Sequence, residues 1–73
     1  MNIYFSRHAG RQMKWRDIDE KEVAETIEFP EKVEDASNDR KNAFKQIGKK
    51  WLKVTFRRES DMVVIITAID KNK

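Results

Sequence analysis

The spacing of the apolar residues changes at Pro30, and this change limits the fold more than any other feature of the sequence. Before Pro30 they recur three or four residues apart, as on one face of a helix. After it they alternate with polar residues, as in strands with one buried face. Proline also disfavours the helical conformation of the residue before it. The sequence therefore predicts an α+β fold, with two short N-terminal helices packed on a three- or four-stranded antiparallel sheet.

The first predicted helix covers Arg7–Arg16, and Ser6 has a side chain suited to cap its N-terminus. Ala9 and Met13 are four residues apart and should face the core together. The residues before Ser6, Ile3–Phe5, are predicted to be a short extended lead-in.

The second predicted helix has a stronger start signal. Asp19 and Glu22 have the spacing of a capping box, in which each side chain bonds the backbone of the other residue. Ile18 and Val23 have the spacing of a hydrophobic staple across the same helix start. Pro30 then ends the helix near Phe29.

Beyond Pro30, turn residues at 37–39, 48 and 59–61 separate segments of alternating or apolar character. The last segment is apolar on both faces, so we expect it to be the most buried strand. The four predicted strands are Lys32–Glu34, Ala43–Ile47, Trp51–Arg58 and Met62–Ile69.

The length of 73 residues allows one domain, residues 1–73, whose own core gives only marginal stability. The chain has no Cys and one His, which excludes disulfides, thiolate zinc sites and His-rich metal sites. Its longest apolar run, Met62–Ile66, is far shorter than a membrane span. No secretory signal pattern is present at the N-terminus. We therefore expect a cytoplasmic domain without cofactor, metal or membrane contact.

Charge is distributed in three blocks. Residues 1–16 have four bases and no acid, residues 17–35 have nine acids and two bases, and residues 36–73 have ten bases and four acids. Within the last block, Arg40–Arg58 contains eight bases and no acid. We expect these eight bases and those of the first helix to border one surface that binds a phosphate backbone, with the helix at Asp19–Glu28 facing away. The alternative is that the charge runs are solvated faces that only maintain solubility.

Several side chains are candidates for RNA binding or chemistry. His8 and Arg16 are eight residues apart with Gln12 between them, so they form a ridge on the first helix, flanked by Arg11 and Trp15. Such a ridge could bind a phosphate and stack a base, although His8 could equally bond a backbone carbonyl. The predicted sheet adds Arg40, Lys41, Lys45, Lys49 and Lys53 as nucleic-acid-binding bases, unless they serve to block edge pairing, and Thr67 as a hydroxyl that could also simply bond backbone.

The order of these motifs resembles the uncharacterised bacterial family called domain of unknown function 4258, over Tyr4–Ile69. That family is similar in fold to the RelE/ParE-like toxins, small α+β proteins with two N-terminal helices on an antiparallel sheet. Relatives in that superfamily include ribonucleases and gyrase poisons. The motifs that resemble the family are, in chain order, Ser6–Ala9, Met13, Arg16, Ile18, Phe29–Val33 and Val63–Ala68.

The resemblance implies candidate catalytic residues. The family's helix His corresponds to His8, its later helix Arg to Arg16, the Arg that opens its basic strand to Arg40, and the Thr of its last strand to Thr67. Members of the family often have a second Arg where this chain has Gln12. That difference weakens a phosphate clamp on the helix and favours binding over cleavage.

Three functions are therefore considered. The first is a toxin-like domain that binds RNA through a basic face without cleaving it. The second is a metal-independent ribonuclease of a toxin–antitoxin pair, with His8 as acid or base and with Arg16, Arg40 and Lys45 on the phosphate. The third is a protein-interaction module whose partner is an acidic, antitoxin-like protein or a second copy of the chain.

Overall fold

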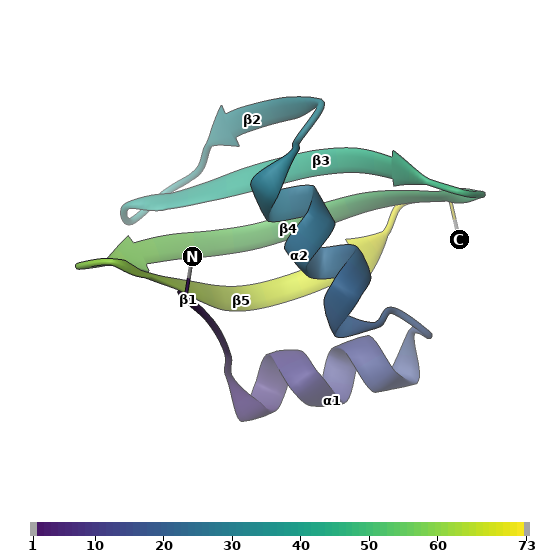
Figure 1. Ribbon diagram of the computed structural model, residues 1–73, viewed down its shortest axis with the longest axis horizontal. Coiled ribbons are helices and arrows are strands. Elements are labelled where there is room, and N and C mark those ends of the chain that lie inside the picture. Colours follow the sequence, from purple (N-terminus) through teal and green to yellow (C-terminus); the bar gives the residue numbers. More distant parts are fainter. Residues whose placement is uncertain (1, 73) are drawn as a thin grey trace.

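The structure is a computed structural model that describes residues 2–72, and it contains two helices and five strands within that range (Figure 1). In chain order these are β1 (Asn2–Phe5), α1 (Arg7–Trp15), α2 (Glu20–Glu28), β2 (Lys32–Asp35), β3 (Arg40–Ile47), β4 (Lys50–Glu59) and β5 (Met62–Asp70).

The strands form one mixed sheet in the order β1-β5-β4-β3-β2. Strands β2 to β5 are antiparallel neighbours, and β1 pairs in parallel with β5. The predicted α+β class is confirmed, whereas the prediction of a purely antiparallel sheet of three or four strands is wrong. The lead-in at Ile3–Phe5 is the missing strand, because Ile3 pairs with Val63 and Phe5 with Ile65. Both Ile3 and Phe5 are half-buried and pack against the core.

Both predicted helix starts are confirmed. The Ala9 N–H donates to Ser6 Oγ at 3.1 Å, which caps α1. In the capping box of α2, the Glu22 N–H donates to Asp19 Oδ1 at 2.8 Å and the Asp19 N–H donates to Glu22 Oε1 at 3.0 Å. Helix α2 ends at Glu28, two residues before Pro30.

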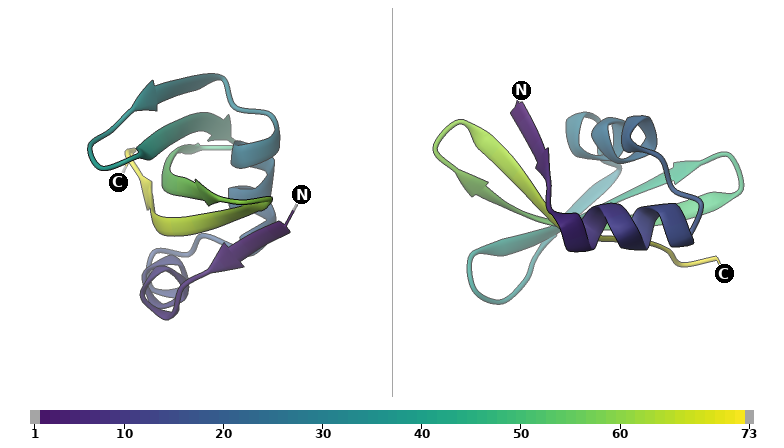
Figure 2. Two further views of the ribbon diagram at one scale, coloured as in Figure 1. Left: turned by 90° about the vertical axis from the view of Figure 1, so that its left-hand side faces the viewer. Right: turned by 90° about the horizontal axis from the view of Figure 1, so that it is seen from below.

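The two helices do not pack on the sheet in the same way. Helix α2 crosses one face over β3 and β4, whereas α1 follows β1 and lies along the edge of β5 (Figures 1 and 2). Ser6 Oγ donates to the Ile65 carbonyl at 3.3 Å, and Arg16 Nη1 donates to the Ala68 carbonyl at 3.0 Å. Because α1 occupies the sheet edge, the predicted packing of both helices on one face is wrong.

The three hairpin turns lie where the turn residues predict them. Asn38 and Asp39 have φ angles of 60° and 62°, which is the left-handed pair required by a type I′ turn. Gly48, with φ 60°, joins β3 to β4, and Ser60, with φ 55°, joins β4 to β5. These turns fix the register of β2 to β5.

The core lies between α2, the inner side of α1 and one face of the sheet. We call that side of the sheet the helix face. Its central side chains, Ala43, Leu52, Val54 and Ala68, are fully buried. The opposite side, which no helix of residues 2–72 covers in Figure 2, is called the open face. None of the described helices is long and apolar enough to cross a membrane.

Candidate nucleic-acid interface

The strand register arranges the side chains of the open face in rows across the sheet, and three neighbouring rows form the candidate interface. The first row contains Arg40, Arg57, Val64 and Tyr4, each directly opposite the next. The second row contains Glu34, Asn42, Thr55 and Thr67, and the third contains Lys32, Phe44, Lys53 and Ile69. Neighbouring side chains in a row belong to residues that are directly paired across adjacent strands, so their Cβ atoms are about 5 Å apart.

A bulge in β5 sets the position of Thr67. Thr55 pairs with Thr67 while the next residue, Phe56, pairs with Ile65, so Ile66 has no partner on β4. The extra residue brings Thr67 to the open face although Ile65, two residues earlier, points into the core. Strict alternation along β5 would place Thr67 on the helix face instead.

Two arginines face each other in the first row. Arg40 and Arg57 are direct cross-strand partners, an arrangement in which like charges repel. Arg57 Nη2 forms an ion pair with Glu59 Oε1 at 3.0 Å, but Arg57 Nε is buried and has no hydrogen-bond partner in residues 2–72. A buried donor without a partner costs about 1–3 kcal/mol. An anion placed between Arg40 and Arg57 would remove the repulsion between these two like charges.

A chain of hydrogen bonds connects α1 to the second row. Thr67 Oγ1 donates to Gln12 Oε1 at 2.5 Å, and Arg16 Nη1 donates to the same oxygen at 3.2 Å. Across the sheet, Thr55 Oγ1 donates to Asn42 Oδ1 at 2.7 Å. Gln12 therefore brings two predicted site residues, Arg16 and Thr67, together and makes one flank of α1 continuous with the open face.

The outer side of α1 forms an open hollow of about 580 Å³. His8 and Trp15 both lie on its wall, about 20° apart around the helix axis because seven residues separate them. Trp15 is 91% exposed, which is unusual for so large an apolar side chain. The residues that line the hollow are His8, Arg11, Gln12, Lys14 and Trp15.

Aromatic rings occupy the other end of the open face. Phe44 and Trp51 stack with centroids 6.0 Å apart and planes at 24°, and Lys32 Nζ lies 4.7 Å from the Phe44 centroid. Lys53 is next to Phe44 in the third row and forms neither a hydrogen bond nor an ion pair through its side chain with any residue of 2–72. Its ammonium group is available to a ligand on this face.

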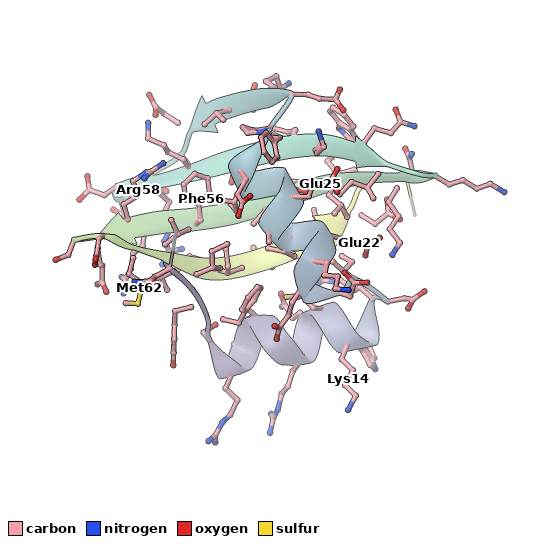
Figure 3. All side chains as sticks on the ribbon, viewed as in Figure 1. Lys14, Glu22, Glu25, Phe56, Arg58 and Met62 are labelled. Atoms are coloured by element: carbon pink, nitrogen blue, oxygen red, sulfur yellow. The ribbon has the colours of Figure 1, made fainter. Side chains whose placement is uncertain are left out.

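The prediction that all eight bases of Arg40–Arg58 share one surface is wrong, because alternate residues of a strand point to opposite faces. On the side of α2, Lys45 Nζ donates to the Phe29 carbonyl at 2.8 Å, and Lys50 Nζ pairs with Glu22 Oε1 at 2.9 Å. Arg58, labelled in Figure 3, lies directly opposite the core residue Val63 and is therefore also on this side. Three bases of the run, Arg40, Lys53 and Arg57, remain on the open face.

Ion pairs shift the pKa values of two side chains that lie outside the open face, Asp35 and Lys50. The hydrogen bond from Lys41 lowers the pKa of Asp35, and the hydrogen bond to Glu22 raises the pKa of Lys50. Lys41 and Lys50 therefore already have carboxylate partners within the chain. Lys49, also predicted as an RNA contact, is exposed in the turn between β3 and β4.

The four candidate catalytic residues do not gather in one place. Arg16 and Thr67 meet at Gln12, and His8 is one helical turn from Gln12. Arg40 instead lines a second hollow of about 390 Å³ beside the turn between β2 and β3, on a strand separated from β5 by β4. His8 is exposed, and no carboxylate of residues 2–72 forms a hydrogen bond or ion pair with it.

Tyr4 was not predicted as part of this interface, whereas Arg57 was expected among the eight bases of one surface and Gln12 on the ridge of the first helix. Arg57 and Tyr4 join Arg40 only through the register, and the pairing of Gln12 with Thr67 joins residues 55 positions apart. For Arg57, the alternation along its strand already places it on the same side as Thr55. Nothing in the sequence indicates the place of Tyr4 or the contact of Gln12 with Thr67.

The comparisons with known proteins give one match. No curated protein and no solved structure matches the chain. Within the described residues, no group of three or more His, Cys, Asp or Glu side chains is arranged to hold a metal ion. The model of the family described as domain of unknown function (DUF4258) matches residues 5–70, nearly the whole length. The chain therefore belongs to the DUF4258 family.

Proposed function

We propose that this chain is a toxin-like domain of RelE/ParE-like fold that binds RNA on the open face of its sheet and on the adjoining side of α1. The observation that carries this proposal is the facing pair Arg40 and Arg57, with its buried, unpaired Arg57 Nε. Arginine is the side chain best suited to hold a phosphate, because its planar group donates two parallel hydrogen bonds.

Aromatic side chains at two ends of this surface support RNA over other polyanions. Tyr4 is 53% exposed and lies two strands from Arg57 in the first row, about 10 Å away. Trp15 is still more exposed, on the flank of α1 that Gln12 joins to the sheet. Exposed aromatic rings beside basic side chains suit unpaired nucleotides. Each nucleobase stacks on a ring while its phosphate contacts a cationic side chain.

The RelE/ParE-like fold, the toxin–antitoxin role and the cellular location in this proposal rest on the family resemblance of the sequence. Two helices preceding the antiparallel strands β2 to β5 agree with a RelE/ParE-like domain, and β1 adds a parallel strand at one edge. A toxin–antitoxin role and a bacterial cytoplasmic location come from the family resemblance of the sequence. Among the targets of such toxins, RNA is the one whose recognition would use both basic side chains and exposed aromatic rings.

The salt dependence of RNA binding tests the proposal. Each phosphate contact made to a single strand contributes about −0.7 to the slope of log affinity against log salt. Contacts by Arg40, Arg57 and Lys53 would give a slope of about −2. Arg40→Gln should weaken binding of a fluorescent single-stranded RNA and reduce the slope by about 0.7.

Arg58→Gln is the matched control, because it removes the same charge from the helix face. Neither Arg40 nor Arg58 forms a side-chain hydrogen bond or ion pair within residues 2–72, so both variants should fold. Equal losses of affinity in the two variants would show that net charge, and not the open face, attracts the RNA.

Cleavage is the second candidate, and the position of His8 next to the Gln12–Thr67 pair favours testing it. A positioned acid or base accelerates a reaction by about 10²–10⁴-fold, so His8→Ala should lower ribonuclease activity by that factor. RNA that is bound but stays intact with the unmodified protein supports binding alone. Cleavage unaffected by His8→Ala would remove His8 from the mechanism.

A further inference from the structure

We propose that two copies of this chain pair through the outer edge of β2, antiparallel and about a twofold axis at Val33. This interaction surface is the edge of the sheet that borders the RNA-binding surface, and the proposal does not depend on RNA binding. The second copy is the partner because the edge is complementary to itself and not to a partner of a single charge.

The outer edge of β2 is free to pair. Strand β2 is last in the sheet order, all four of its residues are exposed, and no element lies beyond it in Figure 1. Val33 is 46% exposed although it is the one apolar residue of the strand. A sheet edge in this state presents unpaired N–H and C=O groups to other chains.

The hydrogen-bond pattern shows which residues present those groups. The Ala36 N–H donates to the Arg40 carbonyl at 2.9 Å, so Ala36 is bonded inward to β3. In an antiparallel ladder, inward and outward residues alternate. Lys32 and Glu34 therefore bond to β3, and the backbone groups of Val33 and Asp35 point outward.

A twofold axis perpendicular to the sheet selects one register. The axis must pass through one residue of the strand, which then lies directly opposite its own copy in either a hydrogen-bonded or a non-hydrogen-bonded pair. An axis at Lys32, Glu34 or Asp35 would place two like charges opposite each other, which is destabilising. An axis at Val33 pairs this apolar side chain with its copy on the helix face and leaves one acceptable arrangement.

With the axis at Val33, the neighbouring pairs are of opposite charge. Lys32 of each copy lies directly opposite Glu34 of the other, and both side chains are on the open face because their partners Phe44 and Asn42 are there. Within one copy, Lys32 Nζ is already 3.4 Å from Glu34 Oε2. In the dimer, the Lys32 and Glu34 side chains of both copies would thus form a group of four alternating charges, where each single copy has one pair.

The ends of the ladder oppose this pairing only weakly. Glu31 of one copy would face Asp35 of the other, but both carboxylates have partners within their own chain. Asp35 Oδ1 accepts from Lys41 Nζ at 2.8 Å, and Glu31 Oε2 accepts from the Gln46 N–H at 2.9 Å. The Glu31 N–H already donates to the Phe44 carbonyl at 2.9 Å, so the ladder is centred on Lys32–Glu34. Such a short ladder makes a small interface, and we expect a dissociation constant between about 10 µM and 1 mM.

Charge reversal tests this register, with self-association measured by analytical ultracentrifugation at up to about 1 mM protein. Lys32→Glu places two acids opposite each other in a homodimer, and Glu34→Lys places two bases there, so each variant alone should be monomeric. An equimolar mixture restores two opposite pairs and should dimerise like the unmodified chain. Both positions are exposed, so the fold is retained, and circular dichroism verifies this.

Val33→Pro is an independent test, because it removes only an outward N–H and should abolish dimerisation while β2 stays paired with β3. No self-association of the unmodified chain at about 1 mM would overturn the proposal. Dimerisation of either charge variant alone would overturn it too, as would a mixture that stays monomeric. None of these results depends on RNA, so a failure of the proposed RNA binding remains a separate finding.

Discussion

Lys50 connects three parts of the fold, and its removal is the perturbation with the clearest expected size. Its ammonium group donates to Glu22 Oε1 at 2.9 Å, to Glu22 Oε2 at 3.1 Å and to the Asp17 carbonyl. Asp17 lies in the turn between the helices with φ 58°, and Glu22 also completes the cap of α2. One side chain of β4 therefore holds the turn and the start of α2 in place.

Lys50→Met removes these bonds and leaves the Glu22 carboxylate without its cation. Hydrogen bonds to charged groups contribute about 1.5–3 kcal/mol, and exposed ion pairs about 0–1 kcal/mol. Both side chains are about one-fifth exposed, at 22% and 20%, so an intermediate loss of about 1–2 kcal/mol is expected after solvent screening. At about 2.1 cal/mol/K per residue, this lowers the Tm by roughly 7–13 °C.

The same pair predicts a pH dependence. The hydrogen bond to Glu22 raises the pKa of Lys50 above its ordinary value of 10.5. A raised lysine pKa stabilises the fold fully below the pKa of the unfolded chain, and this contribution disappears as pH rises through the folded pKa. The difference in Tm between the unmodified chain and Lys50→Met should therefore be constant near neutral pH and decrease above pH 10.5.

Thermal unfolding followed by circular dichroism measures both effects. Glu22→Gln and the double variant complete a cycle whose coupling free energy isolates the pair. A coupling near zero at pH 7, or a fall in Tm below about 2 °C for Lys50→Met, would refute this description of the contact.

Three further predictions concern single side chains. Leu52 is fully buried, so Leu52→Ala should destabilise the fold by about 2–5 kcal/mol in urea unfolding, and a loss below about 1 kcal/mol would contradict its place in the core. Asp19→Ala removes the cap of α2 and should cost about 1 kcal/mol in the same assay, whereas unchanged stability would show that the cap is dispensable. Trp15 is almost fully exposed, so Trp15→Ala should leave the Tm unchanged but weaken RNA binding by about 1–3 kcal/mol in fluorescence anisotropy, and unchanged affinity would exclude stacking on Trp15.

Local signals in the sequence predicted much of the fold. Helix starts at Ser6 and Asp19, the stop at Pro30 and the turn at Asn38 depend on residues within four positions of each other. Such interactions are encoded in short segments and need no knowledge of distant contacts. The α+β class and the order of the elements after the first five residues follow from them.

Long-range pairing could not be predicted in the same way. Strand β1 has four residues, and its place depends on a parallel partner at Met62–Ile65, about 60 positions away. The bases of Arg40–Arg58 form one run in the sequence, but the pleat divides them between two faces. The position of Thr67 additionally depends on the bulge at Ile66, which no spacing in the apolar segment reveals. The parts of the candidate site that sequence analysis missed are therefore those determined by register.

Amide NMR during a titration with single-stranded RNA tests the central claim most directly, because it locates bound RNA on one face of the sheet. We expect the amides of Arg40, Thr55 and Arg57 and the indole of Trp15 to shift together as RNA is added. Resonances of α2 should stay unchanged, because that helix is acidic and covers the opposite face. Shifts centred on α2, or no shifts at low salt, would show that RNA does not bind the open face.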